Sequence, residues 1–257
     1  MDFGIQNRMS KIFQAETGKT VMLAVDHGYF QGPTTGLENL QKTIKPLAPL
    51  ADCLFVTRGM LRNCVDKNLK SSVCLRVSGG PSILRELSNE DIVVSIEEAL
   101  RLNVSGVGMS IFVGAENEDR SIVNLGKLIN ESEKYGMPVL AITAVGREMV
   151  RDARYLGLAC RIASEIGARI VKTYYCEDFY RVTESCPVPI VMAGGKKIDE
   201  KDALIMTANA IKEGASGVDM GRNIFQSENP EAMMSAIKAI VHQGASASEA
   251  HELFKAS

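Results

Sequence analysis

The sequence has 257 residues, of which 46% are hydrophobic and 23% are charged, and its formal net charge is −2. This composition suffices for a large apolar core and gives no overall attraction to nucleic acid or to an anionic membrane. No apolar run approaches the length of a membrane span, and residues 1–8 contain no apolar signal core, so we expect a cytoplasmic protein.

Eight short apolar runs predict β-strands, and each is followed by a helical pattern. The predicted strands are residues 20–25, 51–57, 73–77, 106–113, 138–145, 168–175, 188–192 and 216–220. The predicted helices are residues 1–14, 37–44, 95–102, 120–135, 152–166, 178–185, 199–212, 230–242 and 246–254, with a further helical piece from Arg58. We find no hairpin signal and no linker rich in Pro, Gly or Ser.

This alternation is typical of an α/β fold, the (β/α)8 TIM barrel, with eight parallel strands in one domain over residues 1–257 and extra helices at both ends. The alternative is an open doubly wound sheet, which usually carries a glycine-rich phosphate loop after its first strand. Here Asp26-His27-Gly28 follows the first strand, and the glycine-rich turns follow the seventh and eighth strands. That placement favours the barrel.

Lys172 lies in the middle of the predicted strand 168–175. Helical patterns on both sides predict a strand covered on both faces, so this lysine must leave water. Desolvation favours the neutral amine, which attacks a carbonyl to give a Schiff base. The alternative is a structural lysine that pairs with a carboxylate or reaches a strand end.

Two glycine-rich turns predict a phosphate site. In TIM barrels the active site lies at the carboxyl ends of the strands, and phosphate often binds after strands seven and eight. Glycine lets backbone N–H groups approach an anion closely. The candidate phosphate-binding residues are Gly194, Gly195, Lys196, Gly221 and Arg222, and Lys197 adds charge. The alternative is that these glycines only make tight turns.

Asp26 and His27 end the first predicted strand, so we expect them at the same mouth of the barrel. Either side chain could shuttle protons for Lys172 during imine formation. The alternatives are a salt bridge from Asp26 to Lys172 and a structural hydrogen bond by His27. Weaker candidates near other strand ends are Arg58, Arg76 and Ser78.

The six cysteines form no CxxC pair and mostly lie in apolar segments, where a reduced thiol acts as a small hydrophobe. This pattern argues against disulfides and zinc, so we expect no metal and no bound cofactor. A nucleophilic cysteine is the alternative. His242 and His251 lie in predicted helices, and we expect both on the surface.

Several stretches match one known family. Asp26-His27-Gly28, Lys172-Thr-Tyr-Tyr175 and Gly194-Gly-Lys-Lys197 resemble the DeoC/FbaB class I aldolase family, which groups archaeal fructose-bisphosphate aldolases with related Schiff-base enzymes. Longer matching blocks are residues 20–37, 186–190 and 215–226. The resemblance runs through nearly the whole chain, and it also implies a TIM barrel.

The resemblance implies that Lys172 forms the Schiff base and that Gly194, Gly195, Gly221 and Arg222 hold the phosphate. It implies a thiolase-type acyltransferase in autoinducer-2 breakdown, acting on a phosphorylated small molecule. The acetyl group of a phosphorylated diketone would pass to coenzyme A as co-substrate, giving acetyl-CoA and dihydroxyacetone phosphate. No coenzyme A motif is present, so that partner rests on the resemblance. Family members tend to form ring-based homo-oligomers, often decamers.

One stretch separates acetyl transfer from aldol cleavage. The related aldolases carry a Tyr-Pro-Arg-Gly-like run at the end of strand five, and its tyrosine is an acid/base. Here the stretch is Thr143-Ala-Val-Gly-Arg147. Loss of a proton-transfer group should weaken aldol cleavage by orders of magnitude. The alternatives are a class I aldolase acting on a sugar phosphate such as fructose 1,6-bisphosphate, and a non-catalytic phosphosugar-binding protein.

Overall fold

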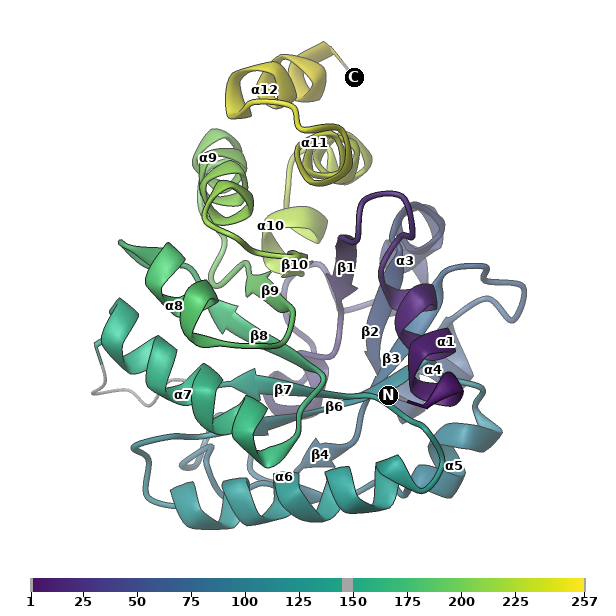
Figure 1. Ribbon diagram of the computed structural model, residues 1–257. Helices are drawn as coiled ribbons and strands as arrows, with labels where there is room; N and C mark the ends of the chain where they lie inside the picture. Colours follow the sequence, from purple (N-terminus) through teal and green to yellow (C-terminus); the bar gives the residue numbers. More distant parts are fainter. Residues whose placement is uncertain (1, 145–149, 257) are drawn as a thin grey trace.

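The computed structural model describes residues 2–144 and 150–256. Its centre is a closed, parallel eight-stranded barrel with the strand order β1-β10-β9-β8-β7-β6-β3-β2 (Figure 1). The strands are β1 (Thr20–Ala24), β2 (Cys53–Thr57), β3 (Ser72–Arg76), β6 (Gly106–Ile111), β7 (Val139–Thr143), β8 (Ile170–Tyr174), β9 (Ile190–Ala193) and β10 (Gly217–Met220). The barrel predicted from the sequence is confirmed.

Helices alternate with the strands and cover the outside of the barrel, as Figure 1 shows. They are α1 (Phe3–Ile12), α2 (Gly28–Gln31), α3 (Leu40–Leu47), α4 (Arg58–Cys64), α5 (Ile96–Arg101), α6 (Glu118–Glu133), α7 (Ala153–Ile166), α8 (Phe179–Ser185), α9 (Glu200–Lys212), α10 (Arg222–Phe225), α11 (Pro230–Gln243) and α12 (Ala247–Ala256). In the described parts of the chain, no helix combines the length and the apolar character needed to cross a membrane.

A small antiparallel pair of strands, β4 (Ser78–Gly79) and β5 (Asp91–Ile92), stands beside the barrel. The sequence carries no hairpin signal for this pair. Each strand has two residues, which is too short to show the alternation that marks a strand in a sequence. The pairing folds the segment of residues 80–90 into an excursion after β3 and returns Glu90 to a buried position.

Side chains alternate between two apolar layers along the barrel strands. On β1, Val21 and Leu23 pack in the shell between strands and helices, whereas Met22 belongs to a separate cluster inside the barrel. Ile12 and Phe13, at the end of α1, join that inner cluster. The interior is therefore filled with apolar side chains, and polar chemistry is left to the carboxyl ends of the strands.

Closure between β1 and β10 depends on Gly217, which pairs with Thr20. Its φ is +142°, and a Cβ atom there would lie 2.0 Å from the Thr20 carbonyl oxygen. Any other residue would force these two strands apart. The first and last strands of the barrel thus meet at a point where only glycine fits.

Asp52 anchors a polar cluster at the amino end of β2. Its carboxylate accepts hydrogen bonds from the Val21 amide at 2.6 Å and the Gln14 amide at 2.6 Å. His242 Nε2 lies 2.7 Å from the same carboxylate. The expectation of a surface His242 was wrong, because its side chain is 9% exposed. Burial alone would raise the pKa of Asp52, but these hydrogen bonds lower it below the usual value.

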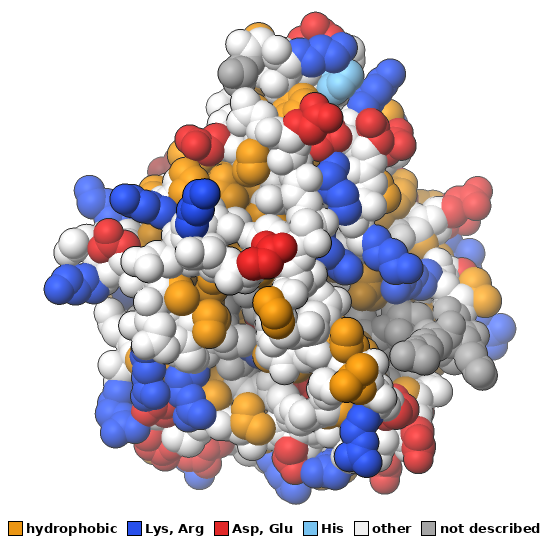
Figure 2. Space-filling view, turned by 180° about the vertical axis from the view of Figure 1, so that it is seen from behind, with side chains coloured by type: hydrophobic (Ala, Val, Ile, Leu, Met, Phe, Trp, Pro, Cys, Tyr) orange, Lys and Arg blue, Asp and Glu red, His pale blue; other side chains and the backbone are white. Residues whose placement is uncertain are grey.

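The surface carries mixed charge. Figure 2 shows acidic and basic side chains interspersed over the rear face, with apolar side chains in small groups between them. This face therefore presents no broad field of one sign, in keeping with the formal net charge of −2.

Candidate active site

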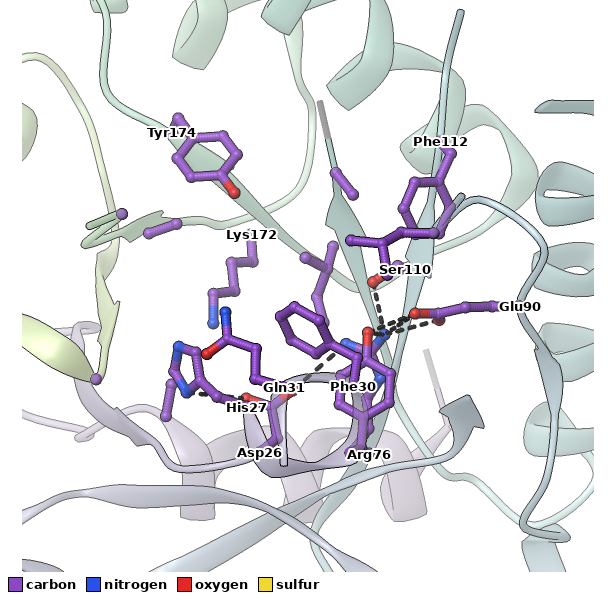
Figure 3. Close-up of a pocket in the computed structure, with 18 of the residues that line it drawn as sticks. Asp26, His27, Phe30, Gln31, Arg76, Glu90, Ser110, Phe112, Lys172 and Tyr174 are labelled. Carbon is purple, nitrogen blue, oxygen red and sulfur yellow. Dashed lines mark hydrogen bonds and ion pairs between the residues drawn. The ribbon is translucent and has the colours of Figure 1, made fainter. Parts of the chain in front are cut away.

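Lys172 points into the barrel. On β8, Ile170 belongs to the inner apolar cluster and Val171 to the outer shell, so the next inward residue is Lys172. Its side chain is 11% exposed. Figure 3 shows it entering the cavity from β8 together with Tyr174, two residues further on. The buried lysine expected from the sequence is therefore a lysine at the open end of the barrel.

The partner of Lys172 is Asp219 on β10. The Lys172 Nζ atom lies 2.8 Å from Asp219 Oδ2, and the Asp219 side chain is fully buried. Val218 and Met220 face the outer shell, so Asp219 faces inward. Lys172 Nζ also lies 5.3 Å from the centre of the Phe55 ring, within range of a cation–π contact.

The Asp219 carboxylate has little other support. Within residues 2–144 and 150–256, neither carboxylate oxygen has a hydrogen bond of good geometry, so the contact with Lys172 is an ion pair. Burial raises the pKa of Asp219, and the charge of Lys172 opposes that rise. A buried carboxylate with one ammonium beside it is placed to exchange a proton with that ammonium.

Asp26 is held by Arg76 rather than by Lys172. Asp26 Oδ2 lies 3.4 Å from Arg76 Nη1. Arg76 is itself buried, and its Nη2 donates to both oxygens of Glu90 at 2.7 Å and 3.0 Å and to the Ser110 hydroxyl at 2.7 Å. The structure therefore does not show the salt bridge from Asp26 to Lys172 that the sequence left open.

Tyr29 and Ser78 complete this buried network. The Tyr29 hydroxyl donates to Glu90 and accepts from Arg76, and the Ser78 hydroxyl donates to Glu90 at 2.7 Å. Burial raises the pKa of Tyr29, so its phenol keeps the proton that it donates. For Arg76, burial opposes the charge, but the carboxylates of Glu90 and Asp26 raise its pKa above the usual value. The network holds the positively charged Arg76 guanidinium next to the Asp26 carboxylate.

His27 is a neutral imidazole at neutral pH. Burial lowers its pKa to about 4; the charge of Asp26 opposes this, and those of Lys172 and Arg222 add to it. Its Nδ1 atom lies 4.0 Å from Asp26 Oδ1, too far for a hydrogen bond. The ring packs edge-on against Phe225, with centroids 5.9 Å apart. His27 can therefore donate or accept one hydrogen bond towards the cavity without carrying charge.

The two turns after β9 and β10 are tied together by Asn223. Its amide nitrogen donates to the Gly194 carbonyl at 2.6 Å, and its amide oxygen accepts from the Ile198 N–H at 2.9 Å. A Cβ atom on Gly221 would lie 2.3 Å from the Ala24 carbonyl oxygen, so this turn needs glycine. The predicted glycine turns are thus held in a fixed mutual arrangement beside β1.

Of the basic residues in these turns, two face the cavity. Arg222 and the exposed Lys196 both line it, and the buried Nε atom of Arg222 has no hydrogen-bond partner in the described part of the chain. Burial lowers the pKa of Arg222. Lys197 instead pairs with Glu200 at 2.7 Å and does not line the cavity. An unpartnered guanidinium nitrogen beside two glycine turns suits an anion.

A single cavity of about 1030 Å³ gathers these residues. Its lining includes every candidate named from the sequence for catalysis or phosphate binding: Asp26, His27, Lys172, Gly194, Gly195, Lys196, Gly221 and Arg222. Of the weaker candidates, Arg76 lines the cavity, Ser78 contacts Glu90, and Arg58 lies outside the lining. Of the stretch 143–147, residues 145–147 lie outside the described residues.

Sequence reasoning missed three buried groups: Asp219, Glu90 and Tyr29. A signal for Asp219 was present, because a carboxylate in the apolar strand Gly217–Met220 is as anomalous as Lys172 in its own strand. Nothing in the sequence pointed to Glu90, which lies in the excursion after β3 and reaches Arg76 only through the β4–β5 pairing.

Two other kinds of site, a metal site and a nucleophilic cysteine, can be compared with the structure. No group of three or more metal-ligating side chains occurs among residues 2–144 and 150–256. The cysteines are free thiols, and burial raises the pKa of Cys53 to about 12 and that of Cys176 to about 11. None of the six lines the cavity. A thiol held protonated and away from the cavity is a poor nucleophile.

Comparison with known proteins identifies the class. Residues 20–227 match the model of the DeoC/LacD family aldolases, and the chain belongs to that family. It is 56% identical over 255 residues to a protein of Photorhabdus laumondii named 3-hydroxy-5-phosphonooxypentane-2,4-dione thiolase, covering 99% of this chain and 88% of the relative. The protein of the same name from Escherichia coli K12 is 54% identical over the same shares of both chains.

Solved structures agree with this class. One is an archaeal fructose-1,6-bisphosphate aldolase with its catalytic lysine bound to the carbinolamine intermediate of the substrate. It is 25% identical, with a TM-score of 0.81, and the alignment covers 92% of this chain and 99% of the aldolase. The fold of this chain therefore fits Schiff-base chemistry.

Proposed function

We propose that this protein is a thiolase that uses Lys172 to cleave 3-hydroxy-5-phosphonooxypentane-2,4-dione and transfers its acetyl group to coenzyme A. The observation that carries the proposal is the inward lysine, with Nζ 2.8 Å from a buried carboxylate, in the cavity that holds both glycine turns. The names of relatives at 54–56% identity support the substrate. No bound cofactor is needed, because the iminium ion is itself the electron sink.

The first step is imine formation. The substrate phosphate binds the turns that contain Gly194, Gly195 and Gly221, with Arg222 neutralising its charge. Lys172 attacks the ketone beside the phosphate-bearing carbon and loses water to give an iminium ion. Asp219, next to Nζ, accepts the proton that the ammonium must lose and returns it during hydrolysis.

The second step is carbon–carbon cleavage. The thiolate adds to the acetyl carbonyl, and the bond between the acetyl carbon and the hydroxyl-bearing carbon breaks. The electron pair moves into the iminium group and leaves an enamine, while acetyl-CoA departs. Protonation of the enamine carbon and hydrolysis of the imine release dihydroxyacetone phosphate. Asp26 and the neutral His27 face the substrate side and serve these proton transfers.

The second candidate is a class I aldolase that acts on a sugar phosphate. The archaeal fructose-1,6-bisphosphate aldolase favours it, because its fold is shared over 92% of this chain. The sequence Thr143-Ala-Val-Gly-Arg147 lacks the tyrosine that the related aldolases use as acid/base, and this favours thiolysis. A non-catalytic phosphosugar-binding protein would not need the ion pair of Lys172 with Asp219.

Product analysis separates the candidates. The phosphorylated diketone, incubated with and without coenzyme A, should give acetyl-CoA and dihydroxyacetone phosphate only when coenzyme A is present. Reversible cleavage of fructose 1,6-bisphosphate, with no reaction of the diketone, would instead identify an aldolase.

Borohydride trapping tests the lysine. Reduction in the presence of the diketone should add mass to the peptide that contains Lys172, and Lys172→Met should abolish both the label and turnover, lowering the rate by roughly a thousandfold or more. Lys196→Met is the matched control, because it removes an exposed ammonium from the same cavity and, with the diketone in excess, should leave the labelling of Lys172 intact. A label on another lysine would contradict the assignment.

We further propose that the chain works as a single barrel domain in a cytoplasmic homo-oligomer. The closed barrel supports the single domain, and the family resemblance supports the oligomer. Size-exclusion chromatography with light scattering measures the oligomer size.

A further inference from the structure

The cavity extends well beyond the phosphate cradle, which we define as Gly194, Gly195, Gly221 and Arg222. Its volume of about 1030 Å³ lies at the upper end of pockets that enclose a whole drug-sized ligand, about 1,000 Å³. A five-carbon phosphate that spans the cradle and Lys172 occupies only one side of this space. The remaining side is free for a second substrate.

The unfilled side lies diametrically opposite the cradle. In the strand order β1-β10-β9-β8-β7-β6-β3-β2, the cradle follows β9 and β10, and the strands facing them across the barrel are β3 and β6. A substrate whose phosphate sits in the cradle and whose ketone reaches Lys172 on β8 therefore points its acetyl end towards β3 and β6. The thiol must approach from that side.

Apolar side chains line this side of the cavity. We call them the apolar lobe: Phe30, Leu84, Leu87, Phe112 and Ala115. Figure 3 shows Phe112 near Ser110 and Glu90, away from Tyr174, and Phe30 between Lys172 and this group. They come from α2, from the excursion after β3 and from the turn after β6. The lobe thus gives a flexible apolar arm a surface that leads towards Lys172.

The excursion is held in place while its tip remains uncovered. The Ile83 N–H donates to the Phe30 carbonyl at 3.0 Å, and Ser88 hydrogen-bonds to Glu86 and Asn117. Leu84, between these anchors, is 89% exposed although it lines the cavity. A single exposed leucine is common on protein surfaces, so the evidence for a ligand contact is that Leu84 continues the apolar lining formed by Leu87 and Phe112.

One arginine stands at the rim beside the lobe. Arg85 is exposed, and no ion pair involving it occurs in the described part of the chain. Arg151 lies on the other side of the mouth, over the Tyr174 ring at 3.9 Å from its centre, where its charge acts on Arg222 of the cradle. Two acids, Glu86 and Glu116, also line the cavity, but Glu86 accepts hydrogen bonds from its own loop.

We propose that the apolar lobe, with Arg85 at its rim, binds the thiol co-substrate: a long apolar arm that ends in a thiol and carries an anionic, phosphorylated head. Coenzyme A has this chemistry, with the pantetheine arm along the lobe and its phosphates at Arg85. The inference rests on the proposed function, because it assigns the site of its second substrate.

Two variants and two thiols test the head and the arm separately. Leu84→Glu should raise the KM for both coenzyme A and pantetheine by roughly tenfold, because a charge replaces an apolar contact. Arg85→Glu should raise the KM for coenzyme A by roughly tenfold and leave that for pantetheine unchanged, since pantetheine lacks the phosphates. Lys67→Glu, the same charge change in the exposed loop before the amino end of β3, is the matched control.

The readouts separate this inference from the proposed function. Borohydride labelling of Lys172 by the diketone requires no thiol, so it should be normal in all three variants. Normal labelling with an unchanged KM for coenzyme A in Leu84→Glu and Arg85→Glu would overturn the thiol site alone. Absence of labelling in the wild type would overturn the Schiff base. In that case, calorimetric titration of coenzyme A into the substrate-free wild type and into Arg85→Glu tests the thiol site. Equal affinity of the two proteins for coenzyme A would contradict the site.

Discussion

Two aspartates, at opposite ends of the barrel, differ in how their charge is supported. Asp52, at the amino end, accepts hydrogen bonds from Val21 and Gln14 and faces His242, and its pKa lies below the usual value. Asp219, at the carboxyl end, has one ion pair with Lys172, and burial raises its pKa. The ionised form of Asp52 is stabilised by several hydrogen-bond donors, whereas that of Asp219 is opposed by burial and stabilised by one ammonium.

The difference shows how one fold separates stability from chemistry. A carboxylate that is surrounded by donors stabilises the native state as long as it is ionised. Desolvation of a carboxylate that is buried beside a single lysine destabilises the native state. Such a carboxylate is useful where a proton must be transferred. The same contrast holds for the two histidines, because His242 has partners on both ring nitrogens and the Nδ1 atom of His27 has none in the described residues.

Removing the charge of Asp219 should have the largest effect. We expect Asp219→Asn to lower kcat by roughly a hundredfold to a thousandfold with little change in the KM for the diketone, because the proton acceptor beside Lys172 is lost. In the wild type the ionised form acts as base, so the rate should rise with pH through the raised pKa of Asp219. Steady-state kinetics should show that this rising limb is absent in the variant.

Asp52→Asn is the matched control for that experiment. If Asp52→Asn lowered kcat as much as Asp219→Asn does, the contrast between the two ends of the barrel would be contradicted. A folded Asp219→Asn variant with wild-type kcat and pH profile would contradict the catalytic role directly.

Asp52→Asn should instead reduce stability. We expect the free energy of unfolding at neutral pH to fall by about 1–3 kcal/mol, since the charge-assisted hydrogen bonds from Val21, Gln14 and His242 are weakened. Because folding lowers the pKa of Asp52 from the ordinary 3.8, this stabilisation is complete above that value and is lost as pH falls through the lower, folded pKa. Urea unfolding at several pH values should show the variant and the wild type converging only in acid.

His27 should give the smallest effect. With a pKa of about 4 it stays neutral across the neutral range, so its ring proton signals should not shift between about pH 5.5 and 8 in an NMR titration. We expect His27→Gln to lower kcat by roughly tenfold without moving the pH profile, because glutamine keeps a neutral donor and acceptor. His242→Gln is the control and should change stability rather than rate. A His27 signal that titrates near pH 6.5, its ordinary value, would contradict the assignment.

The barrel was predictable because its signals are local. Each buried strand is a short apolar run, and each helix carries its own apolar face, so order and type could be inferred segment by segment. The β4–β5 pair was missed because Ser78 and Gly79 find their partners, Ile92 and Asp91, across the excursion between them. No pattern in two residues distinguishes such a strand from a turn.

The site was predictable only as far as strand ends could be assigned. Lys172, Asp26 and the glycine turns follow from the rule that parallel strands end at one face. The pairing of Lys172 with Asp219 depends on which strands close the barrel and on which face each side chain points to, and a strand pattern specifies neither. Arg76 was recognised only as a weak candidate, because its partner Glu90 arrives through the unrecognised hairpin.

The closure at Gly217 also sets the order of events during synthesis. The barrel is complete only when Thr20 of β1 pairs with Gly217 of β10. The site needs Asp26, which follows β1, and Asp219, which lies on β10. A nascent chain that ends before β10 therefore holds Lys172 without its carboxylate. Barrel closure and the pairing of Lys172 with Asp219 both require β10, so a half-made chain cannot begin the chemistry.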